Sequence, residues 1–425
     1  IVTTGTFTIP LMKKVGYPAN KAAAVEVAAS TDGQLAPPIM GAAAFIIAEY
    51  VNVPYVEVIK AAAVPAFASY AALFYITHIE ASKLGLSGIP RSELPPFFKT
   101  LIGGAHFLVP IVMLLWELII ERHSPELAAF NAIWVMAIIM LLQRPVQAYL
   151  RKESIGAAFK LGIFDIFGAL AGGARNMVSV ALATASAGII VGVVALGLGQ
   201  LITAIIDTLS GGNIFLMLTI TAITSLIIGM GLPTTATYIV MASLTAPAIV
   251  EIGAMNDFIV PLMAAHLFCF YFGILADDTP PVGLAAYAAA AIAKSPPIAT
   301  GIQGFMYDIR TAILPFMFIF NTDLILHDVH SWPQGLLIFA MACFGNFAFA
   351  SATQGWFVAK NKIWEVPLFL GVTLILMRPD LIASLVGMPH DQRYWVYPAG
   401  LVLYGLVYLM QRPRMPKSGP APAPA

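Results

Sequence analysis

Apolar stretches of about 20 residues recur along the whole chain, and this feature constrains its fold more than any other. In lipid every backbone polar group must find a partner within the protein, so a stretch of this length crosses a bilayer as an α-helix. Only 10% of the 425 residues are charged and 59% are hydrophobic, whereas soluble domains carry roughly 25% charged residues. The sequence therefore predicts an all-α polytopic membrane protein in contact with a lipid bilayer.

Charge and motif content exclude several classes of function. The 22 basic and 22 acidic residues balance, so no global field attracts nucleic acid. The chain has no Gly-x-x-x-x-Gly-Lys-Ser/Thr loop and does not itself hydrolyse ATP. Cys269 and Cys343 lie in apolar stretches and are predicted to be buried free thiols. Because the chain starts at Ile1 as if in mid-element, we expect it to be an N-terminally truncated part of a longer protein.

Glycine- and proline-containing motifs interrupt three of the apolar stretches. They lie at residues 30–41 (STDGQLAPPIMG), 229–237 (GMGLPTTAT) and 276–283 (ADDTPPVG). Glycine and proline break the helical ladder, and the freed backbone is tolerated at membrane depth only where it lines protein or a water cavity. Secondary transporters build ion and substrate sites in this way. The alternative is a proline kink that binds nothing.

The remaining pattern divides the chain into segments. Residues 1–11 are too short to span and are predicted to be the second arm of a re-entrant hairpin, and residues 214–250 form another re-entrant hairpin around Gly229. The predicted spans, two of them interrupted, are 22–51, 56–76, 101–120, 127–142, 177–206, 258–293, 298–320, 335–353, 363–377 and 394–410. Residues 151–171 are amphipathic and are predicted to lie along the membrane interface.

The same pattern predicts the domain organisation. We expect a first transport-domain repeat (1–54), scaffold helices with an amphipathic arm (55–206), a second transport-domain repeat (207–294), a final core span (295–330), a three-helix extension (331–412) and a disordered tail (413–425). With the first hairpin opening to the cytoplasm, all but four of the 22 basic residues fall on the cytoplasmic side, the exceptions being Lys60, Arg122, Arg378 and Arg393. This bias supports the predicted topology.

One unit occurs twice in the sequence. Residues 8–16 and 245–253 both place a proline and a glycine six apart, and residues 32–45 and 277–287 both run from an acid through Pro-Pro and Gly to small residues and an aromatic. Each unit is thus a re-entrant hairpin followed by a discontinuous helix. Basic residues leave the first hairpin and acidic residues the second, so we expect inverted repeats, as in carriers with alternating access around a midplane site.

At these residues the chain resembles a known family, the large membrane subunit of TRAP (tripartite ATP-independent periplasmic) transporters. The motifs that carry the resemblance are 5–10 (GTFTIP), Ala29-Ser30 with Pro37-Pro38, 229–235 (GMGLPTT), and 265–268 (AHLF) through Pro280-Pro281. The likeness covers roughly residues 1–320 and is greatest to the fused-permease branch, which is usually served by a TAXI-type periplasmic substrate-binding protein. The last three spans resemble the extension of some fused permeases.

The resemblance implies an elevator-type carrier in the bacterial inner membrane, a multi-pass permease that uses Na⁺ as coupling ion to import a small organic anion, such as a dicarboxylate. One sodium would lie between the first hairpin and the first break, which offers Ser30, Thr31, Asp32 and Gly33. The second would lie between the tip at Gly229 and the second break at Asp277, Asp278 and Thr279. The acids at positions 32 and 278 depart from the family, where these positions more often carry small or apolar residues.

Several candidate residues have a second interpretation. Asp277 is a cation ligand or a helix cap, and Thr234, Thr235 and Thr237 offer hydroxyl groups to a substrate or bond carbonyls of their own helix. The helix that starts at Thr234 points its amino end at the midplane, where it would attract a carboxylate. The predicted substrate-binding residues are Gly231, Pro233, Thr234, Thr235, Thr237, Pro38 and Pro281. Asp308 and Arg310 are expected to pair locally or to face the scaffold.

Two other functions remain open at this point. One is an elevator-type anion carrier that works without a binding protein. The other is an intramembrane aspartyl protease, although the sequence has no Gly-x-Gly-Asp run and we expect no enzyme activity. C4-dicarboxylates, 2-oxoglutarate, glutamate and sugar acids are all compatible with the sequence as substrates.

Overall fold

The computed structural model describes residues 1–86, 88–193, 196–197 and 199–415, and in this part every named element is a helix. Six helices are long and apolar enough to cross a membrane, or seven if the bent pair α17 (Glu365–Met377) and α18 (Pro379–Leu385) counts as one span. The predicted all-α polytopic fold is therefore confirmed. The predicted tail lies outside the described residues from residue 416 onward.

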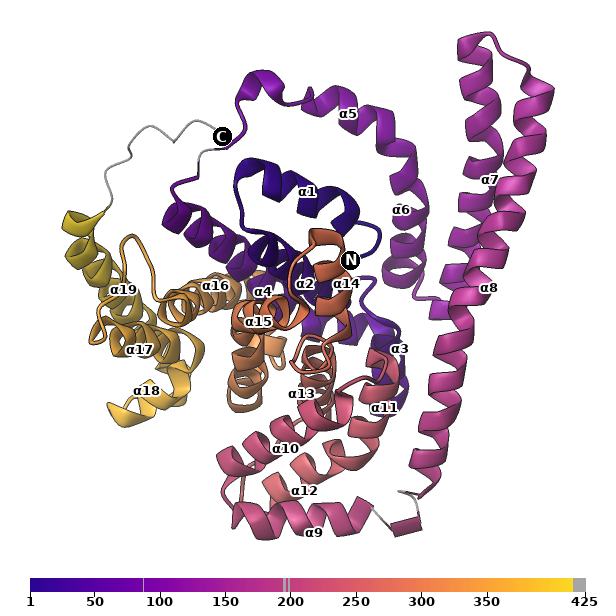
Figure 1. Cartoon of the computed structure of the whole chain (residues 1–425). Coiled ribbons are helices and arrows are strands. Elements are labelled where there is room, and N and C mark those ends of the chain that lie inside the picture. Colours follow the sequence, from indigo (N-terminus) through magenta and orange to yellow (C-terminus); the bar gives the residue numbers. More distant parts are fainter. Residues whose placement is uncertain (87, 194–195, 198, 416–425) are drawn as a thin grey trace.

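The helices that carry the interrupted stretches form the centre of the molecule (Figure 1). From the first half of the chain come α1 (Gly5–Val15), α2 (Ala19–Leu35), α3 (Ala42–Val51) and α4 (Tyr55–Leu84). From the second half come α10 (Ile214–Gly229), α11 (Thr234–Leu244), α12 (Ala246–Met255), α13 (Leu262–Leu275), α14 (Leu284–Ala293) and α15 (Pro297–Phe320). We call these ten helices the central block.

All three predicted breaks are present, but the first begins later than expected. Helix α2 continues through Ser30–Gly33, which the sequence placed in the interruption, and ends at Leu35. The cause is the following Pro37, because a residue before proline avoids the helical region, and Ala36 is extended with ψ 113°. The second break spans residues 276–283, between α13 and α14. At the third, α10 ends at Gly229 and α11 begins at Thr234.

The two discontinuous helices pack crosswise. The first half of one, α2, contacts the second half of the other, α14, and α3 contacts α13 and α11. Two broken helices packed in this way run antiparallel, so their breaks lie at the same level. The Thr31 hydroxyl, one turn before the first break, donates to Asp278 in the second. The helix that follows each repeat starts after a proline, α4 after Pro54 and α15 after Pro296.

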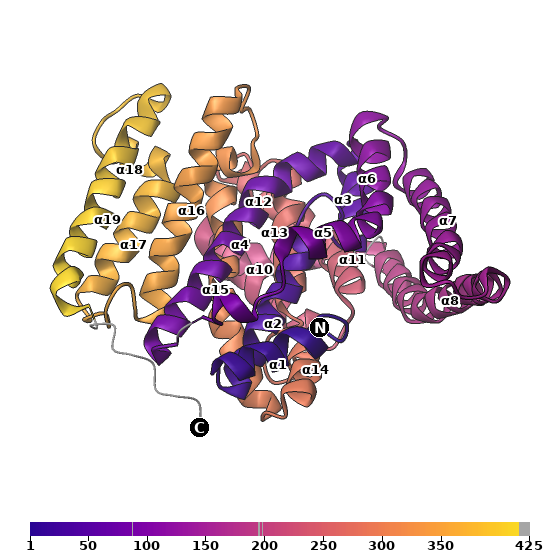
Figure 2. The same ribbon diagram turned by 90° about the horizontal axis from the view of Figure 1, so that it is seen from above.

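The segment between α4 and α10 forms an arm, whose long helices α7 and α8 run along one edge of the molecule (Figure 2). Its elements are η1 (Arg91–Glu93), α5 (Phe97–Gly104), η2 (Ala105–Leu108), α6 (Val109–Leu115), η3 (Trp116–Ile120), α7 (Pro125–Arg151), α8 (Ile155–Val193) and α9 (Gly199–Ser210). The predicted separation of a segment at 151–171 from a span that starts at 177 is wrong, because α8 is one helix of 39 residues, while an interfacial position of 151–171 stays a prediction. Gly172 and Gly173 weaken a helix by about 1 kcal/mol each but do not end it as proline would.

The C-terminal extension packs on the opposite edge (Figure 2). It contains α16 (Trp332–Gln354), α17, α18, η6 (His390–Val396), α19 (Tyr397–Gln411) and η7 (Arg412–Arg414), and it follows η5 (Thr322–Ile325). Helix α16 lies along α4, where Asn346 donates to the Ala68 carbonyl at 3.3 Å. Asp323 of η5 accepts hydrogen bonds from Arg393 and Tyr394. The extension is thus joined to the central block by buried polar contacts.

Gly229→Ala is expected to lower stability, because the added Cβ would lie 2.5 Å from Ala276 Cβ and 2.8 Å from Thr237 Cγ2. Overpacking of this kind costs about 1–3 kcal/mol, which would be measured as a lower melting temperature of the purified protein. Gly405→Ala on α19 is the matched control, since no atom lies within 4 Å of its added Cβ. Equal melting temperatures for the two variants would contradict the tight contact between the hairpin tip and the second break.

Candidate functional site

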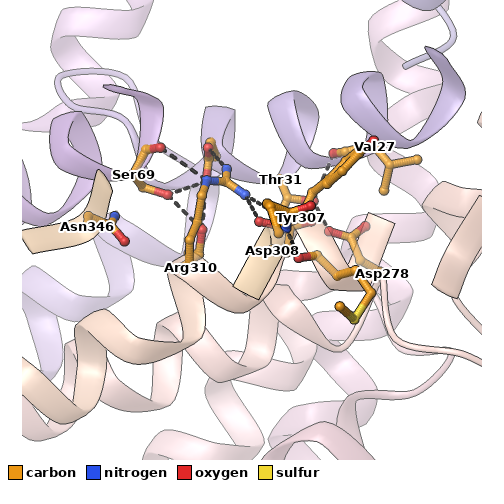
Figure 3. Close-up of polar contacts among 12 residues, drawn as sticks. Val27, Thr31, Ser69, Asp278, Tyr307, Asp308, Arg310 and Asn346 are labelled. Carbon is orange, nitrogen blue, oxygen red and sulfur yellow. Dashed lines mark hydrogen bonds and ion pairs between the residues drawn. The ribbon is translucent and has the colours of Figure 1, made fainter. Parts of the chain in front are cut away.

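A buried polar cluster lies where the two breaks meet α4 and α15 (Figure 3). Its members come from α2, α4, the second break and α15, and all are shielded from solvent: Thr31, Asp32, Ser69, Asp278, Asp308, Arg310 and Thr311. Figure 3 shows it as a row, with Ser69 at one end, Arg310 and Asp308 in the middle and Asp278 at the other end. Asn346 of the C-terminal extension lies beside Ser69. We call these residues the break cluster.

Arg310 holds the cluster together. Its side chain is fully buried and forms ion pairs with Asp32 and with Asp308, the latter at 2.9 Å between Nη1 and Oδ1. The guanidinium also donates to the backbone carbonyls of Ser69, at 3.2 Å, and Tyr307. A planar guanidinium with several fixed donors suits such a multiple contact, which a lysine could not reproduce. Local pairing of Asp308 with Arg310 was predicted, whereas the reach to Asp32 was not.

Asp32 is fully satisfied by its neighbours. Besides the ion pair with Arg310, its Oδ1 accepts from the hydroxyl groups of Ser69, at 2.9 Å, and Thr311, at 3.3 Å. The negative charge of this predicted sodium ligand is therefore compensated by a guanidinium. Thr31 and Asp32 lie in the last turns of α2, near Ser30 and Gly33, where carbonyl oxygens at the end of a helix lack intrahelical partners.

Asp278 and Asp308 form the unsatisfied part of the cluster. Asp278 Oδ2 accepts from the Thr31 hydroxyl, and Asp308 Oδ1 accepts from Arg310. The two carboxyl groups lie within hydrogen-bonding reach of each other. Their remaining oxygens, Asp278 Oδ1 and Asp308 Oδ2, are buried without a hydrogen-bond partner. Two buried carboxylates in contact are costly, so a proton shared between them, or a cation, is needed to satisfy the pair.

The hairpin tip lies directly against the second break. The space beside Gly229 is filled by Ala276, and a Cβ on Gly231 would touch Val282 at 3.4 Å. The tip thus lies against Ala276, the residue before Asp277, while the second sodium site stays a prediction. The carboxylate of the half-buried Asp277 makes no hydrogen bond or ion pair to the described residues, and the Thr279 hydroxyl donates to the Leu275 carbonyl at 2.7 Å within its own turn.

The predicted substrate-binding residues differ in exposure. Those at the tip and the second break are accessible or partly accessible, namely Gly231, Pro233, Pro281, Thr234 and Thr235. Thr237 is fully buried and donates to the Pro233 carbonyl at 3.2 Å, so its hydroxyl serves its own helix. The carbonyl of the half-buried Pro38 accepts from Tyr55 at 2.9 Å. Thr234 and Thr235 therefore remain the hydroxyl groups free to meet a ligand.

Three polar contacts near the breaks were missed from the sequence. Ser69 and Thr311 share a hydrogen bond of 2.7 Å inside the cluster. The buried Glu26 of α2 accepts hydrogen bonds from Thr4 and Thr8, which join α1 to α2. A single serine or threonine in an apolar helix gives no sequence signal of its own. The sequence did contain one indication, Glu26 in the alanine-rich stretch at 22–29. An intramembrane carboxylate seldom lacks a partner, so its presence predicts a polar contact there.

Arg310→Gln is expected to destabilise the protein by about 3–5 kcal/mol, because it leaves the carboxylates of Asp32 and Asp308 buried without their cation. The loss would be measured as reduced monodisperse yield and a lower melting temperature. Adding Asp32→Asn to this variant should recover part of the loss, since one of the two unpaired charges is then removed. Lys60→Gln serves as control, because its pair with Glu57 is largely exposed and is worth at most about 1 kcal/mol. A similar small effect at Arg310 would contradict its role as the central cation.

Two family models match the chain, and the boundary between them falls at the start of the C-terminal extension. Residues 1–332 match the family model described as "Tripartite ATP-independent periplasmic transporter, DctM component", and residues 335–393 match a domain of unknown function, DUF3394. No curated protein matches the chain. The first match covers the arm and both repeats, and the second covers most of the C-terminal extension. The chain therefore belongs to the DctM family of TRAP transporter membrane components, as its motifs predicted.

Proposed function

We propose that the chain is the permease of a sodium-coupled secondary transporter that imports a small organic anion delivered by a periplasmic substrate-binding protein. Membership of the DctM family makes it a membrane component of a transporter, and large TRAP components work with such a binding protein. Sodium coupling, a carboxylate substrate, the TAXI type of the binding protein and a bacterial inner-membrane location belong to the proposal.

The excess of negative charge in the break cluster carries the proposal. Three fully buried carboxyl groups, those of Asp32, Asp278 and Asp308, face one guanidinium, that of Arg310. If all ionise, three negative charges and one positive charge leave two negative charges uncompensated. Buried charges of one sign persist only with a counter-charge. Two monovalent cations would neutralise the cluster, and a coupling ion is the cation that a secondary transporter brings to such a place.

At the first break the proposed sodium ligands are oxygens at the end of α2. Ser30, Thr31 and Gly33 occupy its last turns, where free carbonyl groups and the negative end of the helix dipole favour a cation. Because Arg310 compensates Asp32, we assign the hydroxyl and carbonyl oxygens of these three residues as ligands and Asp32 as the group that holds Thr311 and Ser69 in place.

At the second break the proposed sodium ligands are Asp277, Thr279 and the carbonyl of Gly229. The Gly229 tip touches Ala276, which places these oxygens in one neighbourhood. The carboxylate of the half-buried Asp277 has no hydrogen-bond or ion-pair partner among the described residues. A cation there would be partly accessible, as a coupling ion that binds and leaves must be. The accessible tip and the less accessible break cluster would then differ in ion exchange rate.

The substrate would bind at the amino end of α11. The first turn of this helix carries Thr234 and Thr235, whose side chains are half-buried, and the exposed tip at Gly231 precedes it. Backbone N–H groups at a helix start attract a carboxylate. This supports an organic acid as substrate. An aspartyl protease is disfavoured, because the contact between Asp278 and Asp308 is fully buried and offers no access to a peptide bond.

The proposed function is tested by uptake into proteoliposomes that contain the complete permease. An inward sodium gradient and the cognate binding protein, loaded with a radiolabelled carboxylate, should both be required for accumulation. Uptake without the binding protein would favour the related carrier that works alone. Equal uptake with sodium replaced by potassium on both sides would overturn sodium coupling.

Asp277→Asn is expected to weaken the sodium dependence of uptake more than it lowers expression. Losing a direct carboxylate ligand should raise the sodium concentration for half-maximal uptake by about 10- to 100-fold, the range seen when groups that support a metal site are removed. Asp257→Asn is the control, since Asp257 is exposed and follows α12 in the same repeat. An unchanged sodium response in the Asp277 variant would count against this residue as a ligand.

Gly231→Leu is expected to abolish transport while the protein still folds. Gly231 has φ +80°, a conformation that leucine rarely adopts, and it is exposed at the tip next to Val282. The strain should distort the turn that presents α11, at a cost of about 1–3 kcal/mol. Binding-protein-dependent uptake is the measurement, with Gly405→Leu on α19 as control. Wild-type uptake by the Gly231 variant would mean that the geometry of the tip does not matter.

A further inference from the structure

We propose that the C-terminal extension holds the break cluster in place, with Asn346 of α16 as the positioning residue. Most of the extension matches a domain of unknown function, and a supporting role would explain why it packs against the site. The effect on a sodium ion at the end of α2 rests on the proposed function, whereas the effect on the packing of the cluster does not.

Asn346 is a buried amide in the middle of a mostly apolar helix, and Figure 3 shows it beside Ser69. Its side chain has no exposed surface, and Nδ2 donates to the Ala68 carbonyl of α4 at 3.3 Å. Its Oδ1 is buried and has no hydrogen-bond partner in the described part of the chain. Burying an unsatisfied polar atom costs free energy. The hydrogen bond to α4 is a contact that an apolar residue at this position could not make, and it gives the amide a physical reason to be there.

The Ala68 carbonyl adjoins the residue of α4 that connects the break cluster. The Ser69 hydroxyl donates to Asp32 at 2.9 Å and shares a hydrogen bond of 2.7 Å with Thr311. The Ser69 carbonyl accepts from Arg310 at 3.2 Å. By holding the carbonyl that precedes Ser69, the amide of α16 fixes the height and the rotation at which α4 presents this hydroxyl group.

Helix α4 needs outside support at this point. Pro65 lies inside the helix, one turn before Ser69. A proline in a helix interior removes one backbone hydrogen bond and bends the helix, so the ladder of α4 is weakened where the cluster is attached. Hydrogen bonds from neighbouring helices therefore fix the local position of α4 more than they would in a regular helix.

The extension also holds together the two helices that supply most of the break cluster. Ser351 of α16 and Tyr75 of α4 share a hydrogen bond of 2.9 Å, and Gln354 of α16 donates to the Met306 carbonyl of α15 at 2.9 Å. Helix α16 is thus bonded to both α4 and α15. A helix that only covered the central block against lipid could pack through apolar and small side chains. The extension therefore stays with the break cluster as one unit.

The same support acts on the proposed sodium ligands at the first break. Thirty-first and later residues of α2, among them Thr31, Asp32 and Gly33, occupy its last turn, and the Ser69 hydroxyl orients Asp32. Loss of the Asn346 hydrogen bond would loosen this orientation without removing a ligand. Groups that support the ligands of a metal site contribute about 10- to 100-fold to its affinity. We therefore expect a lower sodium affinity and an unchanged maximal rate of uptake.

The packing is tested by thermal unfolding of the purified complete permease in sodium-free buffer. Asn346→Leu removes the hydrogen bond and keeps a branched side chain. It should lower the melting temperature less in a Ser69→Ala background than in the wild type, because the hydroxyl group that it positions is then absent. The matched control is Asn321→Leu, at a buried amide that donates to the Met377 carbonyl at 2.8 Å. Asn321 lies about three helical turns from Arg310, so its loss should be the same in both backgrounds.

The effect on transport is tested by sodium titration of binding-protein-dependent uptake into proteoliposomes. Asn346→Leu should raise the sodium concentration for half-maximal uptake by about 10-fold and leave the maximal rate at the wild-type value. Asn321→Leu should leave both quantities at the wild-type value. Asn346→Ala, which adds no bulk, replaces the leucine variant in both measurements if that variant does not fold.

Additive losses of melting temperature for Asn346→Leu and Ser69→Ala would overturn the supporting role. Sodium-dependent uptake by the wild type with the same half-maximal sodium concentration in the Asn346 variant would overturn its effect on transport. Non-additive losses together with sodium-independent uptake by the wild type would refute the sodium coupling and leave the support of the cluster by the extension. Non-additive losses together with a sodium response altered only in the Asn346 variant would support both.

Discussion

The buried guanidinium of Arg310 is the group on which the centre of the structure depends. It pairs with Asp32 from the first repeat and with Asp308 on its own helix, and it donates to the backbone of α4 through Ser69. Without this cation, each ionised carboxylate would destabilise the fold, because an unpaired ion in a low-dielectric interior costs several kcal/mol. The cation thus permits three helices to bring polar groups into one place. The guanidinium does not neutralise the contact of Asp308 with Asp278, which therefore depends on a proton or another cation.

Local chain chemistry was enough to predict the all-α polytopic class and the presence of the three breaks. Glycine and proline at 229–233 and at 280–281 ended helices where expected, because their effects on the backbone are independent of distant contacts. The first break was placed too early, since polar residues at 30–34 were read as an interruption. Serine, threonine and aspartate in the last turns of a helix are compatible with helical structure, and only proline enforces its end.

Sequence patterns could not predict which residues of the break cluster form ion pairs and hydrogen bonds with each other. Asp32 and Arg310 are 278 residues apart and meet only because the repeats pack crosswise. The spacing of Asp308 and Arg310 indicated a local pair, and that pair exists, but spacing along one helix says nothing about a third residue on another. Ser69 stands alone in an apolar helix, and its hydrogen bonds to Asp32 and Thr311 follow from tertiary packing. The residue types predicted that the site would be rich in carboxylate and hydroxyl oxygens. Which residues pair with one another could be seen only in the structure.

The packing also separates two parts that attach to the central block in different ways. The C-terminal extension contacts α4 of the central block through hydrogen bonds of Asn346 with Ala68 and of Tyr75 with Ser351, the latter at 2.9 Å. It also contacts η5, which follows the block, through the ion pair of Asp323 with Arg393. The arm meets the block where α8 contacts α11 and where α9 contacts α10, α11 and α12, and its long helices α7 and α8 are otherwise largely exposed. Breaking buried hydrogen bonds costs more than sliding apolar surfaces past each other. Relative motion is therefore cheaper for the arm than for the C-terminal extension, which would have to break such hydrogen bonds in order to move.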